Sequence, residues 1–472
     1  MEFLSIFDML KIGVGPSSSH TLGPWRASQK FIIELSNLNI ISEVSRIKIE
    51  LFGSLSLTGK GHATDIAVVL GLLNEDPETI KTDTITLLIE NIKNSGVLNL
   101  NKNINIPFDF KNDLIFQKTF LPFHSNALKF TAILKNKKEH AAIFYSIGGG
   151  FVIKEFENKN SNKKQSNVPF PIQNATELLG YCKNQNKKIS EIVLQNEIAI
   201  RSEQEVNAYI KLVWKTMATS IYEGCQTEGI LPGGLNVKRR AHEIYDKLGG
   251  PKNSANLNEW LAELRKTEVK FRQILKWVSC FGLAVNEVNA SMGRVVTAPT
   301  NGSAGVIPSV MLYYIMIENH EANFNHVRDF MLVASEIGCI FKKGSTISAA
   351  MGGCQAEIGV SAAMAAAGLC EIMGGSAEQV LIAAEIAMEH HLGLTCDPIG
   401  GLVQIPCIER NAIGALKAIQ AAELALETDP KHAKVPLDKV VSTMWQTAQD
   451  MNNKYKETST GGLAIAVNMA DC

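Results

Sequence analysis

Cysteines beside chain-bending residues are the side chains in this sequence that most readily suggest chemistry. Cys354 follows two glycines, Cys396 precedes Asp-Pro-Ile-Gly-Gly, Cys407 follows a proline, and Cys472 is the last residue printed. Thiolates presented by flexible or kinked backbone are soft ligands that suit an iron–sulfur cluster. Three such ligands leave one iron open to a substrate oxygen, where it acts as a Lewis acid. The intervals match no ferredoxin or zinc pattern, so buried structural cysteines are an equally good interpretation of these residues alone.

The remaining cysteines have no such surroundings. They lie within helical or apolar patterns and are predicted to be inert: Cys182, Cys225, Cys280, Cys339 and Cys370. The total of nine cysteines is odd, and the first residues lack the basic flank and long apolar run of a secretory signal. We therefore expect a cytoplasmic protein with free or metal-bound thiols rather than a disulfide framework.

Composition and charge favour an enzyme or binding protein for small molecules. A chain of 472 residues, 46% hydrophobic and 20% charged, is too long for one core and predicts two or three globular domains. The net charge of −1 and the lack of a basic stripe with interleaved aromatics argue against nucleic acid as a partner. The uncharged stretch 295–317 is interrupted by Pro299, Asn301 and Pro308, so we expect no membrane segment.

The first third of the chain is predicted to be an α/β domain. Apolar and polar residues alternate over 47–51 and 128–132, which is typical of strands with one buried face. A polar stretch at 157–167, followed by Pro169 and Pro171, predicts a linker. We place the end of the α/β domain, residues 1–167, at this linker.

Residues 168–472 are predicted to form a mostly α-helical domain. Apolar residues recur at helical spacing between Val206 and Ile221, and alanine, glycine and serine dominate 347–392. Small side chains let helices approach closely, and the glutamates in this stretch are too frequent for helices that face lipid. We expect buried, closely packed helices there.

Three polar segments of the α/β domain contain histidines. Gly15-Pro-Ser-Ser-Ser-His20-Thr21 places Ser18, Ser19 and His20 in a candidate anion-binding loop, although a solvated turn that caps the next helix is the alternative. Lys60 and His62 lie in a second such segment, and His124 and Asn126 lie in a third. Histidine is the usual proton carrier near neutral pH, and a desolvated lysine can also act as a base. The three histidines could converge on one pocket, or each could be structural.

A fourth segment, in the helical domain, has the composition of a ligand-binding loop. The string from Arg294 to Gly305 contains Thr297 and Asn301 together with glycines, and an apolar run follows. Hydroxyl and amide groups before a helix can bind a charged ligand. The alternative is a long turn that leads into a core helix.

Taken together and in this order, these motifs resemble the iron–sulfur L-serine dehydratases, the bacterial class that works without pyridoxal phosphate. The resemblance extends almost from end to end. Its segments are Ser5-Ile-Phe-Asp8, Gly15-Pro-Ser-Ser-Ser-His-Thr21, Gly53-Ser-Leu-Ser-Leu-Thr-Gly-Lys-Gly-His62, Tyr145-Ser-Ile-Gly-Gly-Gly150, Leu231-Pro-Gly-Gly-Leu235, Thr297-Ala-Pro-Thr-Asn-Gly302 and Cys396-Asp-Pro-Ile-Gly-Gly401.

The resemblance implies a 4Fe-4S cluster, ligated at the positions that match Cys354, Cys396 and Cys407. The implied reaction is β-elimination of water from L-serine, giving pyruvate and ammonia, with the open iron as Lewis acid. We also hypothesise that Cys472, on a flexible tail, occupies the open iron when substrate is absent; the alternative is an inert end. The α/β domain is similar to a regulatory domain of serine biosynthesis enzymes.

For this reaction, the candidate bases are His20, His62, His124 and Lys60, which we do not rank. The candidates for binding the carboxylate and amine of L-serine are Ser18, Ser19, Asn126, Thr297 and Asn301. We expect the pocket to form between the domains, and we take a homodimer as the prior assembly.

The sequence departs from the pattern of this family at two places. Ser125-Asn126 stands where Pro-Asn is commoner, and Ala356 stands where glycine is common. Neither removes a proposed ligand. Two rival functions stay open: an iron–sulfur lyase for L-threonine or L-cysteine, and a non-catalytic cluster protein with four protein ligands.

Overall fold

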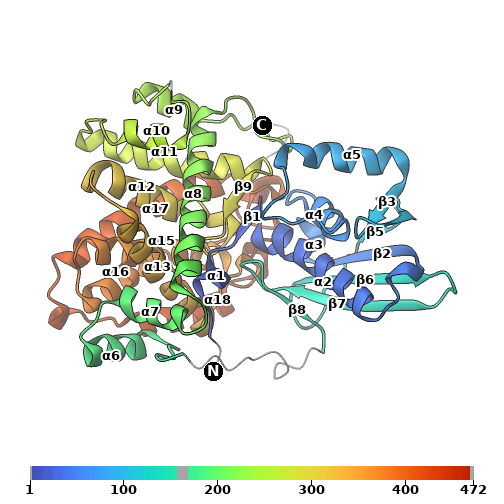
Figure 1. Ribbon diagram of the computed structural model, residues 1–472, viewed down its shortest axis with the longest axis horizontal. Coiled ribbons are helices and arrows are strands. Elements are labelled where there is room, and N and C mark those ends of the chain that lie inside the picture. The colour runs from blue at the N-terminus through green and yellow to red at the C-terminus, as the bar shows by residue number, and fades with distance from the viewer. Residues whose placement is uncertain (1–2, 157–167, 253, 468–472) are drawn as a thin grey trace.

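The computed structural model describes residues 3–156, 168–252 and 254–467. An α/β part and a larger helical part lie side by side (Figure 1), as the sequence predicted. The predicted linker at 157–167 lies outside the described residues.

The α/β part is built on a five-stranded sheet with the strand order β5-β2-β6-β7-β8. Only β2 and β5 run parallel, and the other neighbours are antiparallel. The strands are β2 (Val44–Gly53), β5 (Leu114–Phe116), β6 (Asn126–Leu134), β7 (Glu139–Ser146) and β8 (Val152–Lys154). The alternation predicted at 47–51 and 128–132 is confirmed, because these segments lie in β2 and β6 and pair with each other. Ile49 faces Phe130, and both are fully buried.

Helices and a short hairpin complete the α/β part. The helices α2 and α4 pack against each other and share one hydrophobic core with the sheet. The elements are α2 (Gly23–Asn37), α3 (Ser54–Leu57), α4 (Thr64–Leu72), α5 (Ile85–Ser95), β3 (Val97–Leu100) and β4 (Ile104–Pro107). The segments that contain His20 and His62 therefore immediately precede α2 and α4.

The helical part surrounds α15, which is buried at every position from Ile358 to Glu371. Its neighbours are α12, α13, α16 and α17. Small residues are needed here: a Cβ on Gly368 would lie 2.9 Å from the ring of Phe330. The helices are α6 (Ala175–Gln185), α7 (Ile189–Ile198), α8 (Glu203–Gln226), α9 (Ala241–Lys247), α10 (Leu257–Leu264), α11 (Phe271–Ala290), α12 (Val306–Tyr313), α13 (Phe324–Gly344), α14 (Ala349–Gly352), α15 (Ile358–Ile372), α16 (Ala377–Glu389), α17 (Cys407–Leu426), α18 (Leu437–Asp450) and α19 (Leu463–Ala466).

The beginning of the chain packs with the helical part. Helix α1 (Ile6–Met9) contacts α13, and β1 (Ile12–Val14) forms an antiparallel pair with β9 (Arg294–Val296). The Ser5 hydroxyl donates to the carboxylate of Glu197 at 2.7 Å. The first helix and strand of the chain thus belong to the helical part, and the sheet of the α/β part follows them in the sequence. The segment between them connects the two parts.

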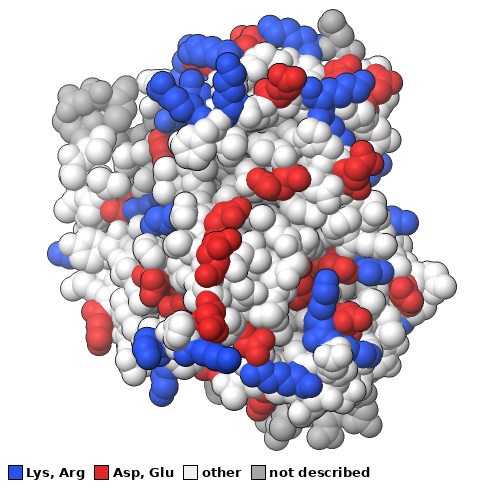
Figure 2. Space-filling view, turned by 90° about the vertical axis from the view of Figure 1, so that its left-hand side faces the viewer, with Lys and Arg blue, Asp and Glu red and all other residues white. Residues whose placement is uncertain are grey.

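The surface of the helical part carries charges of both signs. On the face shown in Figure 2, Lys and Arg gather near the top and bottom, and Asp and Glu extend across the middle. In the described ranges, no helix is both long and apolar enough to span a membrane.

Candidate active site

Three buried thiols interact electrostatically in the helical part, and we call Cys354, Cys396 and Cys407 the thiol group. Their exposed fractions are only 1%, 3% and 6%. The Sγ atoms of Cys354 and Cys396 and a carboxylate oxygen of Glu357 lie within 4.8 Å of one another. Every cysteine among the described residues is a free thiol. Buried free thiols are the soft donors that an iron–sulfur cluster needs, so this donor set fits the implied cofactor.

Arg410 supplies positive charge to the thiol group. It lies three residues after Cys407 on α17, and it donates to Cys354 Sγ at 3.2 Å and to Asp397 Oδ1 at 3.1 Å. A hydrogen bond with Cys396, together with the charge of Arg410, lowers the pKa of the Cys354 thiol against the opposing effect of burial. Arg410 interacts electrostatically with all three thiols. A cation at this point offsets the negative charge of deprotonated ligands.

A segment near the end of the chain brings a carboxyl group beside the thiol group. The Cys396 N–H donates to the carbonyl of Tyr455 at 2.8 Å, and the Glu457 N–H donates to the carbonyl of Cys396 at 2.9 Å. The Leu463 N–H donates to Asp397 Oδ2 at 2.8 Å. These bonds fix the segment 455–463, and with it Glu457, next to the thiol group.

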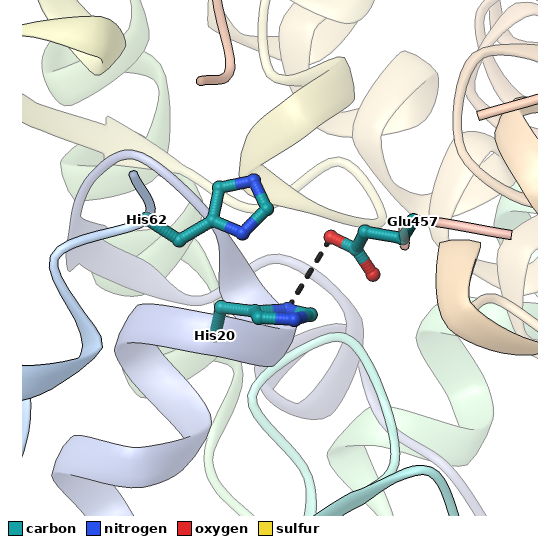
Figure 3. A group of neighbouring side chains, drawn as sticks. All are labelled: His20, His62 and Glu457. Carbon is teal, nitrogen blue, oxygen red and sulfur yellow. Dashed lines mark ion pairs between the residues drawn. The ribbon is translucent and has the colours of Figure 1, made fainter. Parts of the chain in front are cut away.

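Histidines of the α/β part also lie near Glu457, and we call His20, His62 and His124 the histidine group. The rings of His20 and His62 lie edge to face with centroids 4.5 Å apart. His20 Nδ1 is 3.3 Å from Glu457 Oε1, and Figure 3 shows the carboxyl group pointing at the two rings. His20 lies in a π-helical turn at Ser18–Leu22. Two parts of the chain that are far apart in sequence thus form one polar cluster.

The two ring nitrogens of His20 are both engaged, whereas one nitrogen of His62 is open. His20 Nδ1 is 2.8 Å from Ser19 Oγ, and Nε2 is 3.1 Å from Ser54 Oγ. The Ser54 hydroxyl itself donates to the carbonyl of Glu457 at 2.8 Å. His62 Nδ1 is buried and has no hydrogen-bond partner in the described part of the chain. His20 is therefore held in place by its neighbours, and His62 has a nitrogen available to a ligand.

Burial keeps the histidine group neutral. It lowers the pKa of His20 well below the usual value, with further lowering from His62 and His124. It lowers the pKa of His62 to about 3 and that of His124 to about 4. The pKa of Glu457 is raised, first by burial and then by the charge of Glu357. Near neutral pH the imidazoles are therefore unprotonated and able to accept a proton.

Several predicted substrate-binding groups have no protein partner. The hydroxyl of Ser18 and both side-chain amide atoms of Asn126 and Asn301 are buried without a hydrogen bond within residues 3–156, 168–252 and 254–467. Leaving a buried polar group unsatisfied costs about 1–3 kcal/mol, so such groups in a native structure need an explanation. These residues are among those predicted to bind a charged substrate, and that role stays a prediction.

Thr297 has a different position. Its hydroxyl donates to the carbonyl of Met9 at 3.0 Å and accepts from the Lys11 N–H at 2.9 Å. The side chain therefore supports the pairing of β1 with β9. It does not belong to the unpartnered groups, and its role in substrate binding stays a prediction.

Lys60 lies apart from the histidine group. Its side chain is exposed and its Nζ lies over the ring of Phe116, 5.4 Å from the centroid. The adjacent Gly61 instead approaches the helical part, where a Cβ would lie 2.4 Å from the carbonyl oxygen of Gly401. The proposed fourth cysteine, Cys472, lies outside the described residues.

Sequence reasoning missed three charged residues of the site: Glu357, Arg410 and Glu457. Glu357 is buried against Gly302, where a Cβ would lie 2.9 Å from Glu357 Oε2. Arg410 had a usable signal, because it follows Cys407 by three residues on a helix and therefore shares its face. Glu457 had no comparable signal, since its position depends on backbone bonds between distant segments.

The fold and the site together define a two-part protein in which a candidate metal centre adjoins neutral histidines. Comparison with known proteins agrees with this division. The family model for the serine dehydratase alpha chain matches residues 184–464, and that for the serine dehydratase beta chain matches residues 5–157. The chain belongs to the serine dehydratase family.

Curated relatives match over their full length. The chain is 46% identical to an L-serine dehydratase of Haemophilus influenzae over 98% of this chain and 99% of that protein. It is 44% identical to L-serine dehydratase 1 of Escherichia coli over the same shares. It is also 46% identical to an L-serine dehydratase of Mycobacterium tuberculosis, over 99% of this chain and 100% of that one.

Proposed function

We propose that this protein is an iron–sulfur L-serine dehydratase that converts L-serine to pyruvate and ammonia without pyridoxal phosphate. One observation carries the proposal: Glu457 connects the buried free thiols, through its backbone bond with Cys396, to the buried neutral histidines, through its contact with His20. The full-length similarity to proteins named L-serine dehydratase supports the same substrate.

The thiol group would hold a 4Fe-4S cluster, with Arg410 offsetting its negative charge. A cluster with three protein thiolates supplies Lewis acidity toward a substrate hydroxyl. The remaining requirements, which are to bind the amino acid, orient it and move its α-proton, fall to the side chains of this chain.

His62 is our candidate for the base that removes the α-proton. Its Nδ1 is buried and open, and its lowered pKa keeps the ring neutral. His20 is unsuited to this role because Ser19 and Ser54 engage both of its nitrogens. His20 and Glu457 instead form the wall that orients the His62 ring. A positioned base of this kind contributes about 10²–10⁴-fold to the rate.

The unpartnered groups are suited to the charged ends of an α-amino acid. The amide N–H groups of Asn126 and Asn301 can donate to a carboxylate, and their oxygens can accept from an ammonium group. The Ser18 hydroxyl can do either. Several directed bonds fix the orientation of the α-hydrogen and the β-hydroxyl before reaction.

The reaction then needs no external redox partner. Loss of the α-proton and of the β-hydroxyl group leaves aminoacrylate and water, and aminoacrylate tautomerises and hydrolyses to pyruvate and ammonia. Abundant free thiols are suited to a reducing compartment, so we place the proposed enzyme in the cytoplasm. A homodimer stays a prediction, as does the role of Cys472.

The test is anaerobic purification, followed by iron and sulfide analysis and by measurement of pyruvate release before and after exposure to air. We expect about four iron and four sulfide per chain, and activity on L-serine that is lost in air. Parallel assays with L-threonine and L-cysteine would measure substrate preference. Activity that survives air and iron chelation would contradict the proposal.

A further inference from the structure

A polar pocket lies in the α/β part, and none of its lining residues belongs to the histidine group. It has a volume of about 450 Å³ and is formed by α5, β5, the start of α4 and the turn before β5. These elements lie on the right of Figure 1. The polar lining residues are Lys60, Lys93, Lys111 and Asp65.

The pocket carries excess positive charge. In the described part of the chain, Lys60, Lys93 and Lys111 form no salt bridge, whereas many other surface lysines do. Asp65 is the carboxyl group that faces them, and one of its oxygens accepts from the N–H of Ile66 at 2.9 Å. Three ammonium groups against one carboxyl leave a net positive charge, and converging cations in a concave site attract anions.

Aromatic rings form the other walls of this pocket. Lys60 Nζ lies 5.4 Å from the ring centroid of Phe116, and Lys93 Nζ lies 5.3 Å from that of Phe110. Leu114 and Ile115 complete the apolar lining. A pocket with cations and apolar walls suits an anion that has a carbon skeleton, and its volume is larger than a single inorganic anion needs.

Two of the lining residues flank His62 in the sequence. Lys60 is two residues before His62, and Asp65 is three residues after it. Between them, Thr64 donates from its hydroxyl to the carbonyl of His20 at 2.6 Å. A ligand that changes the position of Lys60 is therefore expected to change the position of the short loop that contains His62.

We propose that this pocket binds a small organic acid with two or more carboxylates and thereby adjusts the loop that positions His62. The ligand's carboxylates pair with the lysines, and its carbon skeleton contacts Phe110 and Phe116. Binding requires neither the cluster nor turnover, so this proposal can fail independently of the proposed function.

Isothermal titration of the anaerobically purified full chain tests the binding. The probe is succinate, which chelates iron weakly, and inorganic phosphate and acetate are the comparison anions. The variant K93Q/K111Q removes two of the lysines and leaves the proposed catalytic residues intact. The matched control is K48Q/K138Q, which removes two exposed lysines elsewhere in the same part.

We expect succinate to bind about tenfold more weakly to K93Q/K111Q than to the control, because two charge-assisted contacts are lost. Phosphate and acetate should bind the unmodified chain more weakly than succinate. No binding of succinate, equal binding to the two variants, or equally tight binding of phosphate would overturn the assignment.

Steady-state rates on L-serine test the link to His62. Saturating succinate should change KM or kcat of the control variant and should change neither parameter of K93Q/K111Q at the same concentration. An unchanged rate in the control, despite measured binding, would overturn the link between the pocket and the loop.

Discussion

The thiol group and the histidine group both contact Glu457, but the surroundings of the two groups differ in charge. Beside the thiol group the protein places a cation: Arg410 donates to Cys354 and interacts with the other two thiols. It buries the histidine group, and this burial keeps the rings neutral, although the hydrogen bond with Ser54 raises the pKa of His20 against it. One half is thus built to hold negatively charged ligands, and the other to accept a proton.

The two environments suit two different tasks: the thiol group is suited to bind a cofactor through anionic thiolates, and the histidine group is suited to take up a proton. A cation close to His62 would lower its proton affinity further, and an apolar wall without Arg410 would leave buried thiolates uncompensated. Glu457 lies where the two environments meet. The following predictions test the division in order of decreasing effect.

The substitution Cys354→Ser should have the largest effect, because it removes one proposed ligand of the cluster. We expect the iron and sulfide content to fall and pyruvate formation to drop about a thousand-fold, because Lewis-acid catalysis is worth several kcal/mol. Cys182→Ser is the matched control, since Cys182 is also buried but lies in α6, outside the thiol group. Equal losses in both variants would show that the thiol group has no special role.

The substitution Asn301→Ala should reduce substrate binding without weakening the fold. Both amide atoms of Asn301 lack partners among the described residues, so their removal breaks no protein hydrogen bond. We expect kcat/KM on L-serine to fall about 10- to 100-fold, as for a hydrogen bond to a charged group. The unfolding midpoint in urea should stay the same or rise.

Asn411→Ala is the contrasting variant. The side chain of Asn411 accepts from the Gly305 N–H and donates to the carbonyls of Gly302 and Cys407. Its loss should lower the free energy of unfolding by about 1–3 kcal/mol. If Asn301→Ala proved as destabilising as Asn411→Ala, the amide of Asn301 would be structural and not a ligand group.

The smallest effect concerns stability at low pH. Burial depresses the pKa of His62 from 6.5 to about 3, so below about pH 6.5 the unfolded chain binds a proton that the folded chain does not. Stability therefore falls as the pH decreases through this range. Each such histidine contributes a slope of about 1.4 kcal/mol per pH unit.

The variant His62→Asn should remove one such contribution. Urea unfolding under anaerobic conditions, compared at about pH 7 and about pH 5, should show a smaller loss of stability for the variant than for the unmodified chain. The same pH dependence in both proteins would contradict a buried, neutral His62.

Local patterns allowed much of the fold to be predicted. The alternation at 47–51 and 128–132 predicted strands because the period of a strand is visible within five residues, and the two segments pair in the sheet. The abundance of small residues predicted close helix packing, and α15 is buried at every position from Ile358 to Glu371. No local pattern could predict the pairing of β1 with β9, because the paired residues lie some 280 positions apart in the sequence.

The cysteines and histidines of the site could be predicted from the sequence. The three thiols and three histidines were selected by their neighbours in sequence, and the structure places Cys354 near Cys396 and His20 near His62. The bonds of Thr297 to Met9 and Lys11 could not be predicted from local patterns, because these partners are distant in the sequence.

The central claim is that the thiol group holds the cofactor while His62 moves the proton. One sample of His62→Asn tests it, if iron and sulfide content and pyruvate formation from L-serine are measured together under anaerobic conditions. We predict a full complement of iron and sulfide with kcat lowered about 10²–10⁴-fold. Unchanged turnover, or loss of the iron and sulfide along with the activity, would contradict this division of roles.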